Sequence, residues 1–301
     1  MGFIPMYDVF LRYPGFRVKA VTLSYDDGVE QDEDLLKILN TYGLKATFNI
    51  NSALMAPEGT VYPPDQLHRR LPESKIRRIY LKDGHEIALH SLHHKYMDQL
   101  STGQILYELI EDRVRLERTT GQLVRGFAAP YGNISAELEK CLELSGIVYG
   151  RGVSCSMSLE LPNNLRNISP SCRHNSPGTD ALVEHFCNES PLREFHNRNP
   201  WLFYMWGHSY EFERDNSWQR IKELAKQLGR RDDVWYATNL EVFTYITDFR
   251  RLVYSADGTM VFNPTSQRIW LESAGENFVV DPGKTVTIKQ ITAGQFVATE
   301  K

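Results

Sequence analysis

Short apolar segments rich in β-branched and aromatic residues alternate along the chain with longer segments whose apolar residues recur at helical spacing. The first apolar segment ends at the Asp-Asp-Gly of residues 26–28, a stripe of leucines follows, and Gly43 lies where a helix C-cap glycine is expected. This alternation continues to about residue 250. Strands are expected at residues 18–25, 46–50, 86–89, 126–129, 147–150, 201–206 and 234–238. Helices are expected around residues 35–42, at residues 74–82, 101–121, 135–145 and 218–228, and from about residue 239.

Repeated strand-helix units predict an α/β fold in which helices cover a parallel sheet that is closed or nearly closed as a barrel. After Arg251 the pattern changes to short alternating segments broken by turns such as Asp257-Gly258. These segments are expected at residues 259–262, 268–271, 278–280 and 285–289. We therefore expect two domains, a barrel over residues 1–250 and a small antiparallel all-β appendage over residues 251–301.

Composition limits the partners and the location of the protein. The chain has 301 residues, a formal net charge of −4 and a sequence pI of about 6.2, so its charge gives no reason to expect nucleic acid or a membrane as a partner. No apolar run approaches the roughly 20 residues of a membrane span, and the N-terminus lacks the basic leader of a signal peptide. The chain as given is therefore expected to be cytoplasmic. Its oligomeric state has no signal in the sequence.

Asp26 and Asp27 stand side by side at the expected end of the first strand, on the face where a parallel barrel carries its active site. Adjacent carboxylates on a strand point in different directions, so that one can bind a metal while the other accepts a proton. This division of roles requires a group that compensates their mutual repulsion. The alternative interpretation is an Asp-Asp-Gly turn that only closes a strand.

The second candidate is the run His-Ser-Leu-His-His at residues 90–94, directly after an expected strand. His90 and His94 are four residues apart, a spacing that on one helical turn brings two imidazoles close enough to share a divalent ion, whereas His93 points elsewhere. Two imidazoles and one carboxylate would leave positions open for water and substrate, as in a catalytic zinc site. The alternative interpretation is a histidine-rich surface turn.

Two further polar positions also follow expected strands. Residues 127–132, Phe-Ala-Ala-Pro-Tyr-Gly, form a strand that ends in a proline-fixed turn, whose backbone could supply an oxyanion donor. His208 follows the apolar strand at residues 201–206 and would reach the same face of the barrel. Taken alone, the first segment is an ordinary turn and the second residue an ordinary structural histidine.

Together, and in this order, these segments resemble the polysaccharide deacetylases of carbohydrate esterase family 4. Residues 24–28, Ser-Tyr-Asp-Asp-Gly, are similar to the family's Thr-Phe-Asp-Asp-Gly motif, and residues 90–94 match its His-Ser/Thr-x-x-His motif. Residues 128–131, Ala-Ala-Pro-Tyr, match its Arg-x-Pro-Tyr motif in part, and residues 205–208 are similar to its strand that ends in histidine. The resemblance extends over roughly residues 18–247 and does not include the β tail.

The resemblance implies a distorted (β/α) barrel of the polysaccharide deacetylase type and an activity that cleaves acetamides. It also implies one divalent metal ion, commonly zinc in this family, bound by Asp27, His90 and His94.

The resemblance also implies a catalytic role for three more residues. Asp26 would be the base that deprotonates the attacking water. The backbone N–H of Tyr131 would stabilise the tetrahedral oxyanion, and His208 would protonate the leaving amine.

The chain departs from the family at the arginine of the third motif, which contacts the catalytic aspartate and is Ala128 here, and it has no clear match to the fourth motif. Arg151 directly follows the expected strand at residues 147–150 and could supply the missing cation from the same rim. Arg125 and Arg173 are weaker candidates. The alternative is that Arg151 only solvates the end of its strand.

The leading hypothesis is a metal-dependent hydrolase of C–N amide bonds that removes N-acetyl groups from an amino sugar or oligosaccharide. One alternative is hydrolysis of a non-carbohydrate amide on the same fold, and another is a catalytically silent carbohydrate-binding protein. The presence of a base argues against the silent protein, because binding alone needs no base. The lack of a leader favours a small-molecule or oligosaccharide substrate over a cell-wall polymer.

Overall fold

A computed structural model describes residues 9–193 and 198–288 and divides the chain into two compact units. The larger unit consists of Lys19–Ser190 and Trp201–Phe243. The smaller unit consists of Met1–Val18, Pro191–Pro200 and Thr244–Lys301. Both ends of the chain thus belong to the smaller unit.

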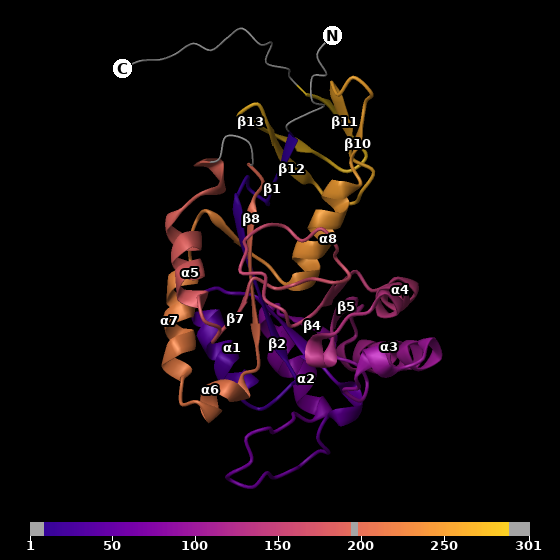
Figure 1. The fold of residues 1–301 in the computed structure, drawn as a ribbon, viewed down its shortest axis with the longest axis vertical. Coiled ribbons are helices and arrows are strands. Elements are labelled where there is room, and N and C mark those ends of the chain that lie inside the picture. The colour runs from indigo at the N-terminus through magenta and orange to yellow at the C-terminus, as the bar shows by residue number, and fades with distance from the viewer. Residues whose placement is uncertain (1–8, 194–197, 289–301) are drawn as a thin grey trace. The chain divides into compact units, whose positions relative to one another are not determined.

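A parallel sheet of eight strands, among the described residues, forms the centre of the larger unit (Figure 1). Its strands are β2 (Lys19–Asp26), β3 (Ala46–Ile50), β4 (Glu86–Leu89), β5 (Gly126–Ala128), β6 (Tyr149–Arg151), β7 (Cys172–Arg173), β8 (Trp201–Gly207) and β9 (Val234–Tyr236). The order is β6-β5-β4-β3-β2-β8-β7, and β9 pairs with the first residues of β2. All eight residues of β2 are buried, as expected for a parallel strand covered on both faces.

Helices flank this sheet. They are α1 (Asp32–Thr41), α2 (Glu73–Tyr80), α3 (Thr102–Thr120), α4 (Ala136–Leu144), α5 (Thr179–Asn188), α6 (Tyr210–Arg214) and α7 (Trp218–Leu228). A further helix, α8 (Asn239–Arg250), begins at Asn239, whose side chain is hydrogen-bonded to Thr22 and Tyr204 of the sheet, and it continues into the smaller unit from Thr244. Helix α7 packs against both α1 and α5, and α3 packs against both α2 and α4 (Figure 1). The capping box of Ser101 and Gln104 and the left-handed Gly121 set the two ends of α3 where the sequence predicts them. No helix within the described ranges is long and apolar enough to cross a membrane.

The sheet curls into an open, distorted barrel, which confirms the predicted fold class. Its two end strands, β6 and β7, are only three and two residues long. They are not paired with each other in the described part of the chain, so the barrel is open where the sequence suggested near closure. The segment between them is mostly irregular, and a bridge from Arg151 to Ile168 continues the pairing beside β6. Few ladder hydrogen bonds can therefore form at this side of the barrel.

The smaller unit contains two antiparallel sheets of three strands each, counted over the described residues. One consists of β1 (Val9–Arg12), β12 (Ile269–Ser273) and β13 (Glu276–Val280), and the other of β10 (Val253–Tyr254), β11 (Met260–Phe262) and β14 (Thr285–Thr287). The predicted strands of the tail match these elements, except that Lys289, expected in the last strand, lies outside the described residues. Strands β1 and β10 were not predicted. The division of domains at residue 250 stays a prediction.

Candidate active site

The predicted site residues gather at the carboxyl ends of neighbouring parallel strands. Asp26 ends β2, and Asp27 follows it. His90 follows β4, Arg151 ends β6, and His208 follows β8. Since all these strands are parallel, their carboxyl ends lie at one edge of the sheet, and side chains distant in sequence converge there.

Asp27, His90 and His94 form a cluster whose possible ligand atoms all lie within 4.8 Å of one another. The Nε2 atoms of His90 and His94 lie 4.0 and 3.9 Å from Oδ1 of Asp27. The two imidazole rings meet edge to face, with centroids 4.9 Å apart. One carboxylate oxygen and two ring nitrogens therefore face a common point.

The backbone that carries the two histidines is not helical, which corrects the geometry assumed from their spacing. Residues 90–94 form a turn in which Ser91 and His94 have positive φ angles of 62° and 53°. Glu108 of α3 holds this turn, because its carboxylate accepts hydrogen bonds from the Ser91 hydroxyl and from the backbone N–H of His93, both at 2.8 Å. The ring of His93 also contacts Glu108, 2.8 Å away, so that it points away from the cluster as predicted.

The protonation states of the cluster suit a divalent cation. The Nδ1 atom of His90 lies 2.9 Å from the carbonyl of Ala128, and as a donor there it leaves Nε2 free to ligate. Burial lowers the pKa of His90 to about 4 and also lowers the pKa of His94, so both rings are neutral near pH 7. Burial tends to raise the pKa of Asp27, but a hydrogen bond from His68 and neighbouring positive charge outweigh it and hold this carboxylate ionised. A carboxylate with two neutral imidazoles is a donor set typical of zinc.

Asp26 directs one carboxylate oxygen toward the Asp27 cluster, and its other oxygen accepts hydrogen bonds that fix the side chain. Its Oδ1 accepts hydrogen bonds from Arg151, at 2.5 Å, and from the amide of Asn49, at 2.8 Å. Its Oδ2 lies 3.9 Å from Nε2 of both His90 and His208. Burial tends to raise the pKa of Asp26, but the charges of Arg151 and the histidines outweigh this and lower it. An ionised carboxylate with one unclamped oxygen can accept a proton.

Arg151 is fully buried, and its guanidinium lies over the ring of Trp206, 4.8 Å from the centroid. The other two arginines considered from the sequence lie elsewhere. Arg125 donates to the carbonyl of Gly146, and Arg173 forms an ion pair with Glu211. Of the three arginines, Arg151 is therefore the one that the structure places on Asp26.

His208 has a buried acidic partner that the sequence analysis missed. Its Nδ1 lies 3.7 Å from Oε1 of Glu211, whose other oxygen lies 3.2 Å from Nε2 of His174. Burial alone would lower the pKa of His208, but the negative charges of Glu211, Asp26 and Asp27 raise it above the ordinary value. The sequence did contain a signal for this pair, because Glu211 follows His208 by three residues at the start of α6.

Tyr131 lies beside this cluster, within the turn that follows β5. Its φ angle is 60°, which an L-residue rarely adopts, and its ring lies against that of His94 with centroids 4.7 Å apart. The exposed rings of Tyr131 and Tyr96 stack in parallel at 3.6 Å. The ring of Tyr131 therefore lies beside the cluster, and the oxyanion role of its backbone N–H stays a prediction.

His68 and Arg70, which the sequence analysis also missed, contact Asp27 from the segment between β3 and α2. Nε2 of His68 lies 3.1 Å from Oδ2 of Asp27, and Nη2 of Arg70 donates to Oδ1 at 3.1 Å. No local pattern links them to Asp27, because more than 40 residues of chain separate the partners.

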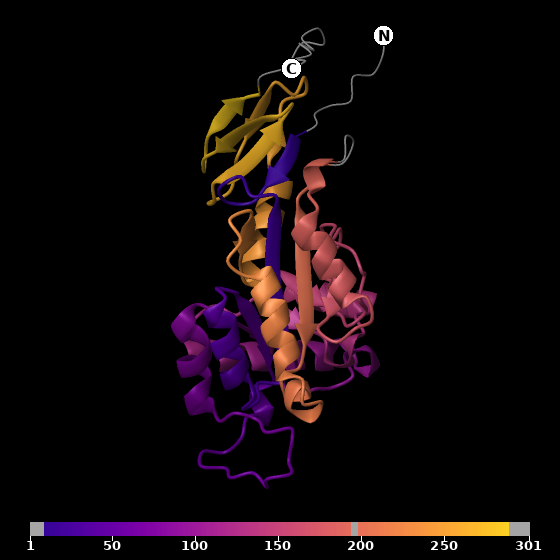
Figure 2. The same ribbon diagram turned by 90° about the vertical axis from the view of Figure 1, so that its left-hand side faces the viewer.

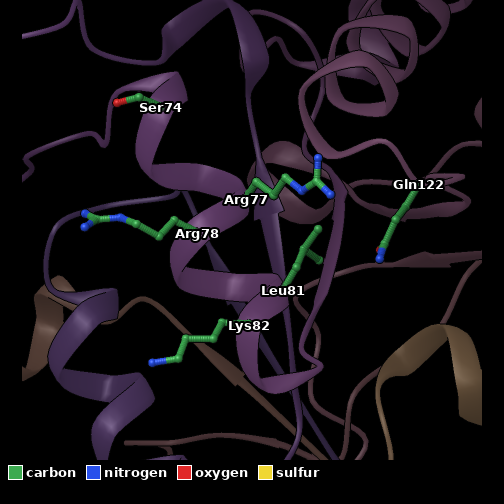
Figure 3. Close-up of a pocket in the computed structure, with 6 residues that line it drawn as sticks. All are labelled: Ser74, Arg77, Arg78, Leu81, Lys82 and Gln122. Atoms are coloured by element: carbon green, nitrogen blue, oxygen red, sulfur yellow. The ribbon is translucent and has the colours of Figure 1, made fainter.

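A separate surface pocket beside α2 shares no residue with this cluster. Its lining residues, drawn in Figure 3, are Ser74, Arg77, Arg78, Leu81, Lys82 and Gln122. Figure 3 shows Arg78 and Lys82 extending away from Arg77, so the three cationic groups do not converge on one ligand. The pocket is therefore no rival to the Asp27 cluster as an active site.

Comparison with known proteins agrees with this architecture. Residues 15–150 match the family model described as polysaccharide deacetylase. Residues 15–150 therefore have the sequence pattern of a polysaccharide deacetylase domain. A Mycobacterium smegmatis structure assigned to the polysaccharide deacetylases is 17% identical, with 80% of this chain and 94% of that chain covered and a TM-score of 0.56, which supports the same fold.

Two other similar proteins are a fungal enzyme and a bacterial protein. The chitin deacetylase of Colletotrichum lindemuthianum is 22% identical over 75% of this chain and 87% of that chain, with a TM-score of 0.49. The uncharacterized protein YlxY of Bacillus subtilis is 35% identical over 107 residues, which are 35% of this chain and 28% of that protein. The match thus spans little more than a quarter of that relative's length.

Proposed function

We propose that this polysaccharide deacetylase domain is a metal-dependent hydrolase of C–N amide bonds that removes the acetyl group from an N-acetylated amino sugar or oligosaccharide. The observation that carries the proposal is the convergence of Asp27, His90 and His94 within 4.8 Å, with Oδ2 of Asp26 and Nε2 of His208 directly beside them. A binding protein would need neither an ionised, buried carboxylate nor a histidine with a raised pKa.

Asp27, His90 and His94 would hold one divalent ion, and zinc suits this donor set best. When bound, the ion supplies Lewis acidity, which polarises an amide carbonyl and makes water a stronger nucleophile. Around it, Asp26 takes a proton from the attacking water at Oδ2, while Arg151 and Asn49 hold Oδ1 in place.

The tetrahedral oxyanion would accept a hydrogen bond from the backbone N–H of Tyr131. His208, whose pKa Glu211 and the two aspartates raise, would donate a proton from Nε2 to the leaving amine. The C–N bond breaks, acetate leaves with the oxygen from water, and the proton taken by Asp26 balances the one given by His208.

Metal analysis of the purified protein followed by measurement of acetate release tests this proposal. The substrates are N-acetylglucosamine, its oligomers and a non-carbohydrate acetamide, each supplied with the zinc-loaded protein. Release from the sugars alone supports the proposed substrate class, and release from the acetamide alone shifts the function to a non-carbohydrate amide. A protein that binds sugar oligomers and releases no acetate from any substrate would instead be a silent carbohydrate-binding protein.

A further inference from the structure

The segment between β3 and α2 carries three consecutive basic residues, His68, Arg69 and Arg70, and none of them has a role in the proposed reaction. Figures 1 and 2 both show the middle of this segment projecting from the rest of the larger unit as an open loop. Its last residues return to the site, where His68 and Arg70 both contact Asp27. The guanidinium of Arg70 therefore contacts the carboxylate that would bind the metal.

Arg70 donates to two atoms of Asp27 and to the side chain of Asn51, which contacts the histidine turn. Its Nη1 donates to the backbone carbonyl of Asp27 at 2.8 Å and to Oδ1 of Asn51 at 2.7 Å, while its Nη2 donates to Oδ1 of Asp27. The amide of Asn51 in turn donates to the carbonyls of His90 and Ser91. One guanidinium therefore ties the segment that carries the carboxylate to the segment that carries both imidazoles.

Asp27 needs such a restraint because its φ angle is 85°, a conformation that is rare for a residue with a side chain. Arg70 bonds both the carbonyl and the carboxylate of this one residue, which fixes its backbone and its side chain together. The side chain of Arg70 is only 15% exposed, so water competes weakly for these contacts.

The contacts leave the metal-facing lone pair of Asp27 available. Oδ1 is the oxygen that faces Nε2 of His90 and His94, and a carboxylate oxygen can accept from Arg70 with one lone pair and ligate with the other. His68 contacts the other oxygen, Oδ2, at 3.1 Å. Arg70 at Oδ1 and His68 at Oδ2 together fix the orientation of the Asp27 carboxylate, and Oδ1 faces the imidazoles.

Arg69 attaches this segment to Glu213 of α6. Its guanidinium makes two hydrogen bonds to the carboxylate of Glu213, at 3.0 and 2.8 Å, and its Nε donates to Glu30 at 3.0 Å. A bidentate arginine–carboxylate pair has a defined geometry. The position of Arg70 therefore does not depend on its contacts with Asp27 alone.

We propose that Arg70 is a positioning residue that sets the affinity and geometry of the metal site by holding Asp27 in its strained conformation. Two effects oppose each other, since a guanidinium repels a dication but pre-organises its ligand. The strain at Asp27 and the link to the histidine turn make pre-organisation the larger effect. Loss of a group that orients a metal ligand typically costs about 10-fold to 100-fold in metal affinity. The inference uses only one part of the proposed function, that Asp27, His90 and His94 bind a divalent ion.

The test is a Zn²⁺ titration of the full chain against a competing chelator, for the wild type, Arg70→Met, Arg70→Lys and the control Arg78→Met. Arg78 is an exposed arginine on α2 (Figure 3). Arg70→Met and Arg70→Lys should both bind zinc about 10-fold to 100-fold more weakly, because lysine keeps the charge but carries its donors on a single nitrogen and lacks the planar fork that Nη1 and Nη2 provide. Arg78→Met should bind like the wild type. The absorption spectrum of bound Co²⁺ should also change in Arg70→Lys, since the ligand geometry loosens.

Unchanged or tighter zinc binding by Arg70→Met would overturn the role of Arg70 and leave the proposed function standing. A wild type that binds no zinc or cobalt overturns both. Circular dichroism of the metal-free proteins separates weak binding from unfolding. If Arg70→Met does not fold, Arg70→Lys carries the test, and wild-type affinity and cobalt spectrum in Arg70→Lys overturn the proposal.

Discussion

The two adjacent aspartates differ in the cation that holds each carboxylate. Oδ1 of Asp26 forms an ion pair with buried Arg151. Oδ1 of Asp27 accepts a hydrogen bond from Arg70 and also faces the imidazole of His94. Their mutual repulsion is thus compensated by one arginine each. This pairing explains how neighbouring carboxylates can remain ionised in a largely buried site and still take different roles.

Asp26→Asn should remove turnover while the metal content stays at the wild-type level. Asparagine preserves the shape of the side chain but cannot accept the proton from water, and loss of a general base typically lowers the rate by about 10² to 10⁴. Metal analysis and kcat for acetate release, measured on the same preparation, check this result. His208→Ala should behave alike, and near-normal kcat in either metal-loaded variant contradicts the assigned roles.

Arg151→Met should lower kcat and move the acid limb of the pH–rate profile to higher pH. The charge of Arg151 lowers the pKa of Asp26 against the effect of burial, so its loss lets this pKa rise and the base becomes protonated at a higher pH. Arg125→Met, at an exposed arginine, should leave the profile unchanged. An unaltered acid limb in Arg151→Met, with metal bound, would show that Arg151 has no part in the reaction.

Glu211→Gln should move the alkaline limb to lower pH. The catalytic acid must be protonated, so activity is lost as the pH rises through the pKa of His208, which Glu211 helps to raise. Without that charge, His208 loses its proton at a lower pH. If the alkaline limb of the pH–rate profile does not move in Glu211→Gln, this limb reflects the titration of a group other than His208.

At the scale of the element, β1 completes a sheet whose other strands come from the far end of the chain. It pairs with β12 in antiparallel register, and Nη2 of Arg12 forms an ion pair with Glu272 at 2.5 Å. Both side chains are almost fully buried. The tight turn to β13 uses Ala274 and Gly275 at positive φ, as a two-residue hairpin requires.

Arg12→Met should destabilise the smaller unit by about 3 kcal/mol, because it leaves the buried carboxylate of Glu272 with a weakened set of partners. Arg268→Met is the matched control in the same unit. Its partner Asp281 and Arg268 itself are both exposed, so its loss should cost less than about 1 kcal/mol. Denaturant unfolding of both variants gives the comparison, and equal losses of stability would contradict the importance of the buried pair.

The sequence predicted the elements of the barrel well because their signals are local. The strands at β3 and β4 match the expected residue ranges, since apolar runs bounded by turns specify them without distant partners. Strand β1 is four residues long and owes its conformation to pairing with β12, so no local pattern revealed it. The turn at residues 90–94 was missed for a similar reason, because Glu108 of α3 folds it.

At the scale of the whole molecule, the candidate site belongs to the larger unit alone. The positions that carry it could be read from the sequence, since parallel strands place their carboxyl ends together. Arg70 could not, because its role depends on contacts that the chain makes only after folding. The smaller unit gathers residues from both ends of the chain, and the residues assigned to the proposed reaction all come from the larger unit.

The metal stoichiometry of His90→Ala and His94→Ala, measured beside the wild type and His93→Ala, tests the central claim most directly. Asp27, His90 and His94 face one point, whereas the ring of His93 is turned to Glu108. We expect one divalent ion per chain in the wild type and in His93→Ala, and no stoichiometric metal in either of the other variants. Full metal content in His90→Ala or His94→Ala would contradict the account.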